Sequence, residues 1–202
     1  STQSPFGNQQ QVAQAVGLPK EKVRIVTPFV GGGFGGKSSA PQVVEAARLA
    51  KATGKPVQVA WTREEEFFLD TFRPAAVVRI RSGLDAAGQL CLWDYQVWAA
   101  GTRSAEPFYD VPHHRIRAYG RWGSDTPKLH LFATGPWRAP GANVNVFARE
   151  SMIDTMAASA KADPLEFRLR NTSDPRMRGV LAEVAGHDDE RQIRRVRLDQ
   201  PQ

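Results

Sequence analysis

The sequence predicts an α+β fold in which helices pack on a mixed sheet. Apolar residues recur at helical spacing over Pro41–Thr53, and they alternate with polar residues, as in a strand, over Leu90–Ala99. Predicted strands and helices do not alternate along the chain as they would in a parallel α/β fold. With 202 residues, 41% of them hydrophobic, the chain can bury a core of one large or two small domains.

Two helices are predicted early in the chain, one on each side of a glycine-rich loop. The first covers Asn8–Val16, and Gly17 is placed to end it. The second covers Pro41–Thr53, because a proline suits the first helical turn and Ser39 can cap it. Gly54 follows the second helix and stops it. Four apolar residues of the second helix are expected on one face: Val43, Val44, Ala47 and Ala50.

Two extended segments and a short helix are predicted around these elements. The apolar run Val23–Val30 is expected as a buried strand, and Val57–Trp61 as a short strand. Thr62 and Glu65 have the spacing of a capping box, so a short helix is expected to begin there. The carboxylates that open this helix, Glu64 to Glu66, suit its positive end better than acid–base chemistry.

The character of the sequence changes near Pro74, where a subdivision of the domain is expected. Ala76–Ser82 and Leu90–Ala99 are predicted as two strands joined by a turn. Alternation in the second strand predicts one buried face, with Cys91 in the core. Residues 101–124 are expected as a loop.

The C-terminal part is predicted to hold one more strand and two helices. The strand covers Leu129–Ala133, and a long helix covers about Asn145–Ala160. Asp163 caps the last predicted helix, which starts at Pro164. Residues 1–185 are therefore expected to form the folded domain, and the charged segment 186–202 is expected to be disordered.

Charge and composition narrow the function classes. The net charge is +6, and much of the basic excess lies between Arg103 and Arg138. A solvated basic face, an anionic cofactor and a nucleic acid all fit this excess, but the basic residues match no known nucleic-acid-binding motif. Cys91 is the only cysteine, which excludes an internal disulfide and a CxxC metal site, and the four histidines lack metal-ligand spacing.

The glycine-rich loop Gly31–Lys37 is the strongest local signal. Five glycines in six residues bring backbone N–H groups close to a ligand, because no side chain intervenes. The loop also matches the P-loop pattern literally through Ser38. A P-loop helix would start near Gly36 and would place Pro41 in its interior at a cost of roughly 3 kcal/mol, which argues against a nucleotide site.

Several spaced motifs resemble the molybdenum-cofactor-binding region of the xanthine dehydrogenase and aldehyde oxidase family. They are Gln3 with Val30–Lys37, the segment Gly135–Gly141 followed by Glu150-Ser151 and Ile153-Asp154, and the segment Asp163–Asn171. The resemblance runs from Ser1 to about Val184. The branch that the chain resembles is the beta subunit of isoquinoline 1-oxidoreductase and the related membrane-bound aldehyde dehydrogenases.

The resemblance implies a cofactor-binding role for particular residues. The Gln3 amide would lie beside the molybdenum, Phe34 and Gly35 would contact the cofactor through backbone N–H groups, and Arg138 with its turn would line the site. The cofactor-binding set is thus Gln3, Gly33, Phe34, Gly35, Gly36, Arg138 and Ala139. No protein side chain ligates the metal, because the pterin dithiolene holds it. The cofactor is a molybdopterin, often as its cytosine dinucleotide.

The implied reaction is the hydroxylation of an N-heterocycle or the oxidation of an aldehyde, with oxygen from water. Family enzymes work with a small subunit that carries two [2Fe–2S] clusters. The family's catalytic Glu motif is not found in this chain, and Ser38 and Pro140 depart from the xanthine-specific pattern. The chain, which begins at Ser1, is therefore expected to be a fragment: inactive and cofactor-free by itself, not binding nucleic acid, and able to self-associate. No secretory signal or membrane span is visible, and the compartment stays open.

Overall fold

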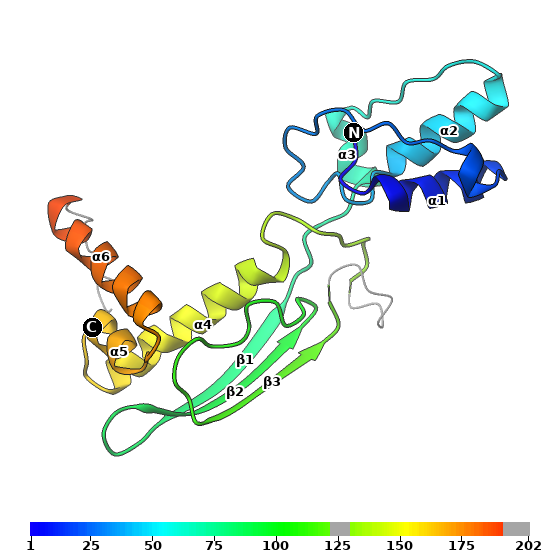
Figure 1. The fold of residues 1–202 in the computed structure, drawn as a ribbon. Helices are drawn as coiled ribbons and strands as arrows, with labels where there is room; N and C mark the ends of the chain where they lie inside the picture. Colours follow the sequence, from blue (N-terminus) through cyan, green and yellow to red (C-terminus); the bar gives the residue numbers. More distant parts are fainter. Residues whose placement is uncertain (122–129, 192–202) are drawn as a thin grey trace. The chain divides into compact units, whose positions relative to one another are not determined.

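The structure, a computed structural model, describes residues 1–121 and 130–191, with side chains through residue 185 (Figure 1). Over this range it contains six α-helices, one short 3-10 helix and a three-stranded sheet, so the α+β prediction is confirmed. The chain divides into two compact units. The first comprises Ser1–Val77, Val97–Arg103 and Ala118–Val144, and the second comprises Val78–Gln96, Ser104–Arg117 and the residues from Asn145 onward.

The first unit is built on the pair of helices α1 (Pro5–Val16) and α2 (Pro41–Thr53), which pack against each other. Both helices end as predicted, at glycines with a left-handed backbone conformation: φ is 66° at Gly17 and 65° at Gly54. The Lys51 ammonium donates to the carbonyl oxygen of Val16 at 2.6 Å and so ties the end of α2 to the end of α1. A short 3-10 helix, Lys20–Lys22, follows α1.

A buried polar contact holds the start of the chain against the loop before α2. The side chain of Asn8, which is 1% exposed, donates to the carbonyl oxygen of Ser39 at 2.9 Å and accepts from the Thr2 hydroxyl. The predicted Ser39 cap is wrong, because the residue in the capping position is Ala40, with φ 44° and no capping side-chain bond. Ser39 contributes its backbone carbonyl instead.

Two predicted strands of the first unit are wrong. Residues 23–30 and 57–61 belong to no strand, and Val26 and Phe29 are 71% and 105% exposed. An apolar run forms a buried strand only when a neighbouring strand accepts its hydrogen bonds, and no such neighbour exists in residues 1–121 and 130–191. The short helix α3 (Arg63–Leu69) is confirmed, with the Thr62–Glu65 capping box formed in both directions.

The second unit contains most of the sheet, whose strand order is β1 (Val77–Leu84), β2 (Leu90–Trp98) and β3 (His113–Tyr119). The β1–β2 hairpin is confirmed, and Asp85 holds its turn by accepting from the backbone N–H groups of Ala87 and Gln89. Strand β3 corrects the loop predicted over 101–124. Its residues are nearly all exposed, so no hydrophobic alternation marks it.

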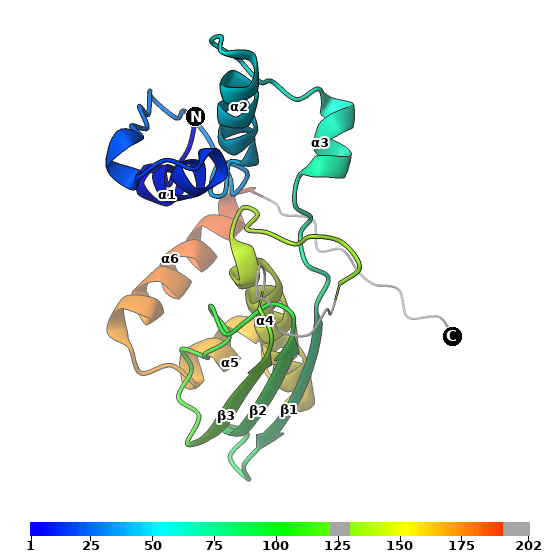
Figure 2. The same cartoon turned by 90° about the vertical axis from the view of Figure 1, so that its right-hand side faces the viewer.

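Three helices accompany the sheet: α4 (Pro140–Ser159), α5 (Pro164–Arg170) and α6 (Pro175–Arg191). Helix α4 lies along one face of the sheet, where the Tyr95 hydroxyl donates to Asn145 Oδ1 at 2.8 Å (Figures 1 and 2). The core on this face contains three completely buried β2 side chains, Trp93, Tyr95 and Val97, as the alternation predicts. Cys91 is only half-buried, so the prediction that it belongs to the core is wrong.

The C-terminal predictions need three further corrections. Helix α4 begins at Pro140, five residues before the predicted Asn145, because a proline is well placed in a first turn. Helix α5, with its Asp163 cap, is confirmed, but it is followed by α6, which was not predicted. Helix α6 continues through Arg191, past the expected domain boundary at 185, and residues 192–202 of the expected tail lie outside the described residues.

The predicted strand Leu129–Ala133 is not formed over its described residues, 130–133. Leu129 itself lies outside the described range. An isolated parallel bridge joins Thr134 to Phe72 instead. No helix in the described part of the chain has the length and apolar character needed to cross a membrane.

Candidate cofactor site

The glycine-rich loop Gly31–Lys37 closes on itself through short turns in the first unit. Gly36 N–H donates to the Gly33 carbonyl at 2.9 Å, and Ser38 N–H donates to the Gly35 carbonyl at 3.1 Å. The Lys37 ammonium reaches back to the Val30 carbonyl at 2.6 Å and links the two ends of the loop. Lys37 is therefore used within the loop, where a P-loop lysine would face the phosphates of a nucleotide.

Gln3 lies against this loop. Its backbone N–H donates to the Lys37 carbonyl at 2.8 Å. A Cβ atom on Gly33 would come within 2.5 Å of Gln3 Oε1, so the loop has room for the Gln3 carboxamide only because residue 33 is glycine. Gln3 is exposed and Gly33 is half-buried, so this contact forms part of the surface of the unit.

The second predicted motif, the turn at residues 135–139, packs against the same loop. A Cβ on Gly35 would overlap the carbonyl group of Pro136 and would lie 2.9 Å from Trp137 Cα. The Arg138 guanidinium carbon lies 5.6 Å from the centre of the Phe34 ring, within the range of a cation–π contact. The structure thus brings together the predicted set from three distant parts of the sequence: Gln3, Gly33, Phe34, Gly35, Gly36, Arg138 and Ala139.

A short segment that sequence analysis missed, Thr71 to Arg73, holds this turn in place. Phe72 exchanges backbone hydrogen bonds with both sides of Thr134: its N–H donates to Ala133 at 2.8 Å, and its carbonyl accepts from Gly135 at 3.1 Å. The guanidinium of Arg73 donates to the Arg138 carbonyl at 2.8 Å and to the Pro140 carbonyl at 3.5 Å. No local motif marks Arg73, because its partners lie more than sixty residues away in the sequence.

Among the described residues, most backbone N–H groups of the loop have no acceptor, and those of Phe34 and Gly35 are two of them. Both residues have positive φ, 47° and 112°, so the backbone here departs from any helix or strand. Backbone N–H groups, the Gln3 amide and the Arg138 guanidinium are donors suited to an anionic ligand, so these residues fit the implied cofactor.

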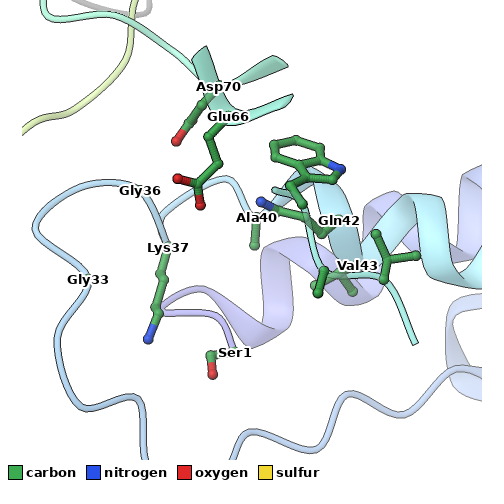
Figure 3. Close-up of a pocket in the computed structure, with 12 residues that line it drawn as sticks. Ser1, Gly33, Gly36, Lys37, Ala40, Gln42, Val43, Glu66 and Asp70 are labelled. Atoms are coloured by element: carbon green, nitrogen blue, oxygen red, sulfur yellow. The ribbon is translucent and has the colours of Figure 1, made fainter. Parts of the chain in front are cut away.

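A cavity of about 440 Å³ opens beside the loop (Figure 3). Gly33, Gly36 and Lys37 form its loop side, and the carboxylates of Glu66 and Asp70 enter from α3 and its end. Over the described residues, no group of three or more His, Cys, Asp or Glu side chains is arranged to hold a metal ion. Helix α2 begins at Pro41, as predicted, so its N-terminus does not coincide with Gly36 as in a P-loop.

The remaining motif residues lie in the second unit, where they pair with one another. Arg168 contacts Asp154 at 2.7 Å and Glu150 at 3.2 Å, and Glu150 also accepts from the Tyr109 hydroxyl at 2.8 Å. Burial, followed by this bond to Glu150, raises the pKa of Tyr109 well above its ordinary value. Arg149 adds a contact to Glu150 at 2.8 Å. These residues join α4, α5 and the loop before β3, which is a structural role.

Residues 1–172 match the family of molybdopterin cofactor-binding domains. Two relatives are the aldehyde oxidoreductase molybdenum-binding subunit PaoC of Escherichia coli K12 and the isoquinoline 1-oxidoreductase subunit beta of Brevundimonas diminuta. PaoC is 32% identical over 79% of this chain and 22% of its own length. The Brevundimonas subunit is 32% identical over 93% of this chain and 26% of its own length.

Solved structures share the fold at lower identity. Quinoline 2-oxidoreductase from Pseudomonas putida 86 superposes with a TM-score of 0.76 at 22% identity, covering 95% of this chain and 28% of that one. The aldehyde oxidoreductase of Desulfovibrio gigas gives 0.74 at 20% identity, covering 90% of this chain and 22% of its own. The chain spans about a quarter of the length of the relatives it matches.

Proposed function

Because the chain belongs to the molybdopterin cofactor-binding domains of the xanthine dehydrogenase and aldehyde oxidase family, we propose that it forms one wall of a molybdenum-cofactor site in an oxidoreductase. The reaction proposed is the hydroxylation of an N-heterocycle or the oxidation of an aldehyde with oxygen from water. The observation that carries the proposal is the convergence of Gln3, the Gly31–Lys37 loop and the turn at 135–139 in a single unit.

The chain's own residues would position the cofactor. The unused N–H groups of Phe34 and Gly35 and the Gln3 amide would donate to its oxygen atoms. The Arg138 side chain, held over the Phe34 ring, would add positive charge next to these donors. The cofactor, often the cytosine dinucleotide form in this family, supplies the redox chemistry when bound. Gly33 and Gly35 keep the loop close to Gln3 and to the turn, which sets the spacing of the donors.

We propose that the catalytic base, the substrate contacts and the partner subunit are not supplied by the predicted cofactor-binding residues. The relatives are named as a molybdenum-binding subunit and a beta subunit, which supports a multisubunit enzyme. A small [2Fe–2S] subunit as the partner is proposed from the family resemblance. One relative is named for aldehydes and another for isoquinoline, which supports these two substrate classes. A hydroxylase site needs a base within hydrogen-bond reach of the reacting carbon, and the family's catalytic Glu motif is not found in this chain. We therefore propose that residues 1–202 alone are inactive.

The test compares the whole enzyme that carries this chain with residues 1–202 alone. Molybdenum and pterin are quantified in both samples, and dye reduction is measured with aldehydes and N-heterocycles. We expect molybdenum, pterin and substrate-dependent reduction in the whole enzyme and neither metal nor activity in the short chain. A whole enzyme without molybdenum would refute the cofactor proposal. Stoichiometric molybdenum with activity in residues 1–202 would refute only the proposed inactivity.

A further inference from the structure

The sheet of the second unit presents a strongly basic face on the side away from α4. Side chains alternate along each strand, and the odd-numbered β2 residues Trp93 and Tyr95 are buried toward α4. Asp94 therefore points to the opposite face. The bidentate contact of Arg115 with Asp94, at 3.0 and 2.6 Å, places Arg115 on that face too.

Three further arginines share this face with Arg115. Arg81 lines the same open groove as Asp94 and Arg115, a space of about 610 Å³ that also includes His113. Arg79 lies two residues before Arg81 on β1, and Arg117 two residues after Arg115 on β3, so both have matching orientation. All four arginines are exposed, and Asp94 is the only carboxylate in the three strands.

The positive charge of this face affects the ionisation of Asp94, the one carboxylate in the three strands. The hydrogen bond from Arg115, and after it the charges of Arg115 and Arg117, hold the pKa of Asp94 below its ordinary value. The arginines stand on β1 and β3, which both pair with β2, and the opposite face of β2 contains completely buried residues, so the sheet fixes the backbone of the arginines. Such a fixed array costs little ordering entropy when a ligand binds.

We propose that this basic face, defined by Arg79, Arg81, Arg115 and Arg117 around Asp94, is a docking surface for an acidic segment of another protein. Guanidinium groups bind carboxylates in paired hydrogen bonds. Arg79 and Arg81 are about 7 Å apart along β1, which is the spacing of alternate side chains in an extended acidic peptide. The inference does not depend on the molybdenum cofactor.

The charges of this face favour an acidic peptide over a second copy of the chain and over a nucleic acid. A second copy of the chain, with net charge +6 and the same arginines, would be repelled from this face. A continuous line of phosphates, as in a nucleic acid, would bring negative charge close to the Asp94 carboxylate, which lines the groove. A polypeptide can place separate carboxylates on the arginines and a donor opposite Asp94.

The test measures fluorescence anisotropy of a short labelled peptide of alternating Glu and Thr with residues 1–202, at about 50 mM salt, where surface charges are weakly screened. The double variant Arg81→Gln/Arg117→Gln is expected to weaken binding about tenfold, because two charge-assisted contacts are lost. Arg24→Gln/Arg48→Gln removes the same charge from exposed sites in the first unit and is expected to change the affinity less than about twofold.

The outcomes separate specific docking from general attraction. Equal weakening by the two double variants would overturn the proposal, since net charge alone would explain the affinity. Absence of peptide binding at this salt would also overturn it. A single-stranded DNA probe that binds more tightly than the peptide, and loses this affinity in Arg81→Gln/Arg117→Gln, would assign the face to nucleic acid instead. Circular dichroism of each variant verifies that the fold is kept.

Discussion

Replacing Gly35 by alanine should separate the glycine-rich loop from the turn that carries Arg138. The new Cβ would overlap the Pro136 carbonyl, lying 2.5 Å from its carbon. That distance is about 1 Å shorter than van der Waals contact, and the opposing atoms are backbone, which cannot rotate away. Gly35 also has φ 112°, a conformation that side chains disfavour. Overpacking of about 1–3 kcal/mol and a backbone cost of about 1–2 kcal/mol predict a loss of roughly 2–5 kcal/mol.

Gly31→Ala is the matched control in the same loop. Its φ of 70° is also positive, but a Cβ there meets no atom within 4 Å, so only the backbone cost of about 1–2 kcal/mol applies. Urea denaturation of both variants measures the free energy of unfolding, and molybdenum content of the whole enzyme measures the site. Gly35→Ala should lose more stability and more molybdenum than Gly31→Ala. Equal effects of the two substitutions would refute the claimed packing of Gly35 on Pro136.

Two more predictions concern contacts that only the structure revealed. Arg73→Met removes the donors to the Arg138 and Pro140 carbonyls, so amide hydrogen exchange at Gly135, whose N–H donates to the Phe72 carbonyl, should accelerate about tenfold. The exposed control Arg24→Met should leave this exchange unchanged, and unchanged exchange in Arg73→Met would show that Arg73 does not hold the turn. Burial raises the pKa of Tyr95 to about 12, so the stability it confers is complete below its unfolded value near 10 and is lost as the pH rises toward 12. Tyr95→Phe should lower the free energy of unfolding by about 1 kcal/mol near neutral pH, because the bond to Asn145 is lost. The variant should also lose less stability than the unchanged protein between pH 8 and pH 11, as measured by urea denaturation. A loss of stability as large as that of the unchanged protein would contradict this assignment.

Local signals in the sequence predicted the elements whose ends depend on neighbouring residues. The Thr62–Glu65 capping box, the Asp163 cap and the glycines after α1 and α2 are all formed as expected. The alternation of β2 correctly predicted its buried face, because a two-residue period leaves no other choice once one side meets a core. These features need no distant partner.

Predictions failed where hydrogen-bond partners lie far away in the sequence. Val23–Val30 is apolar enough for a strand, but no strand pairs with it in residues 1–121 and 130–191. Strand β3 is polar and exposed, and it forms because its backbone pairs by hydrogen bonds with the edge of β2. Cys91 alternates with its neighbours as a core residue would, yet it is half-buried, while Leu90 beside it is 2% exposed.

The sequence by itself determined the family, through several motifs in a fixed order, and the residues that make up the glycine-rich loop. Only the tertiary structure decided that Gln3, Phe34 and Arg138 meet at one place, and that Arg73 holds the turn there. It also decided that Glu150 and Arg168 stabilise the second unit. The physical reason is that composition and spacing govern local conformation, whereas contacts between side chains depend on how distant segments pack.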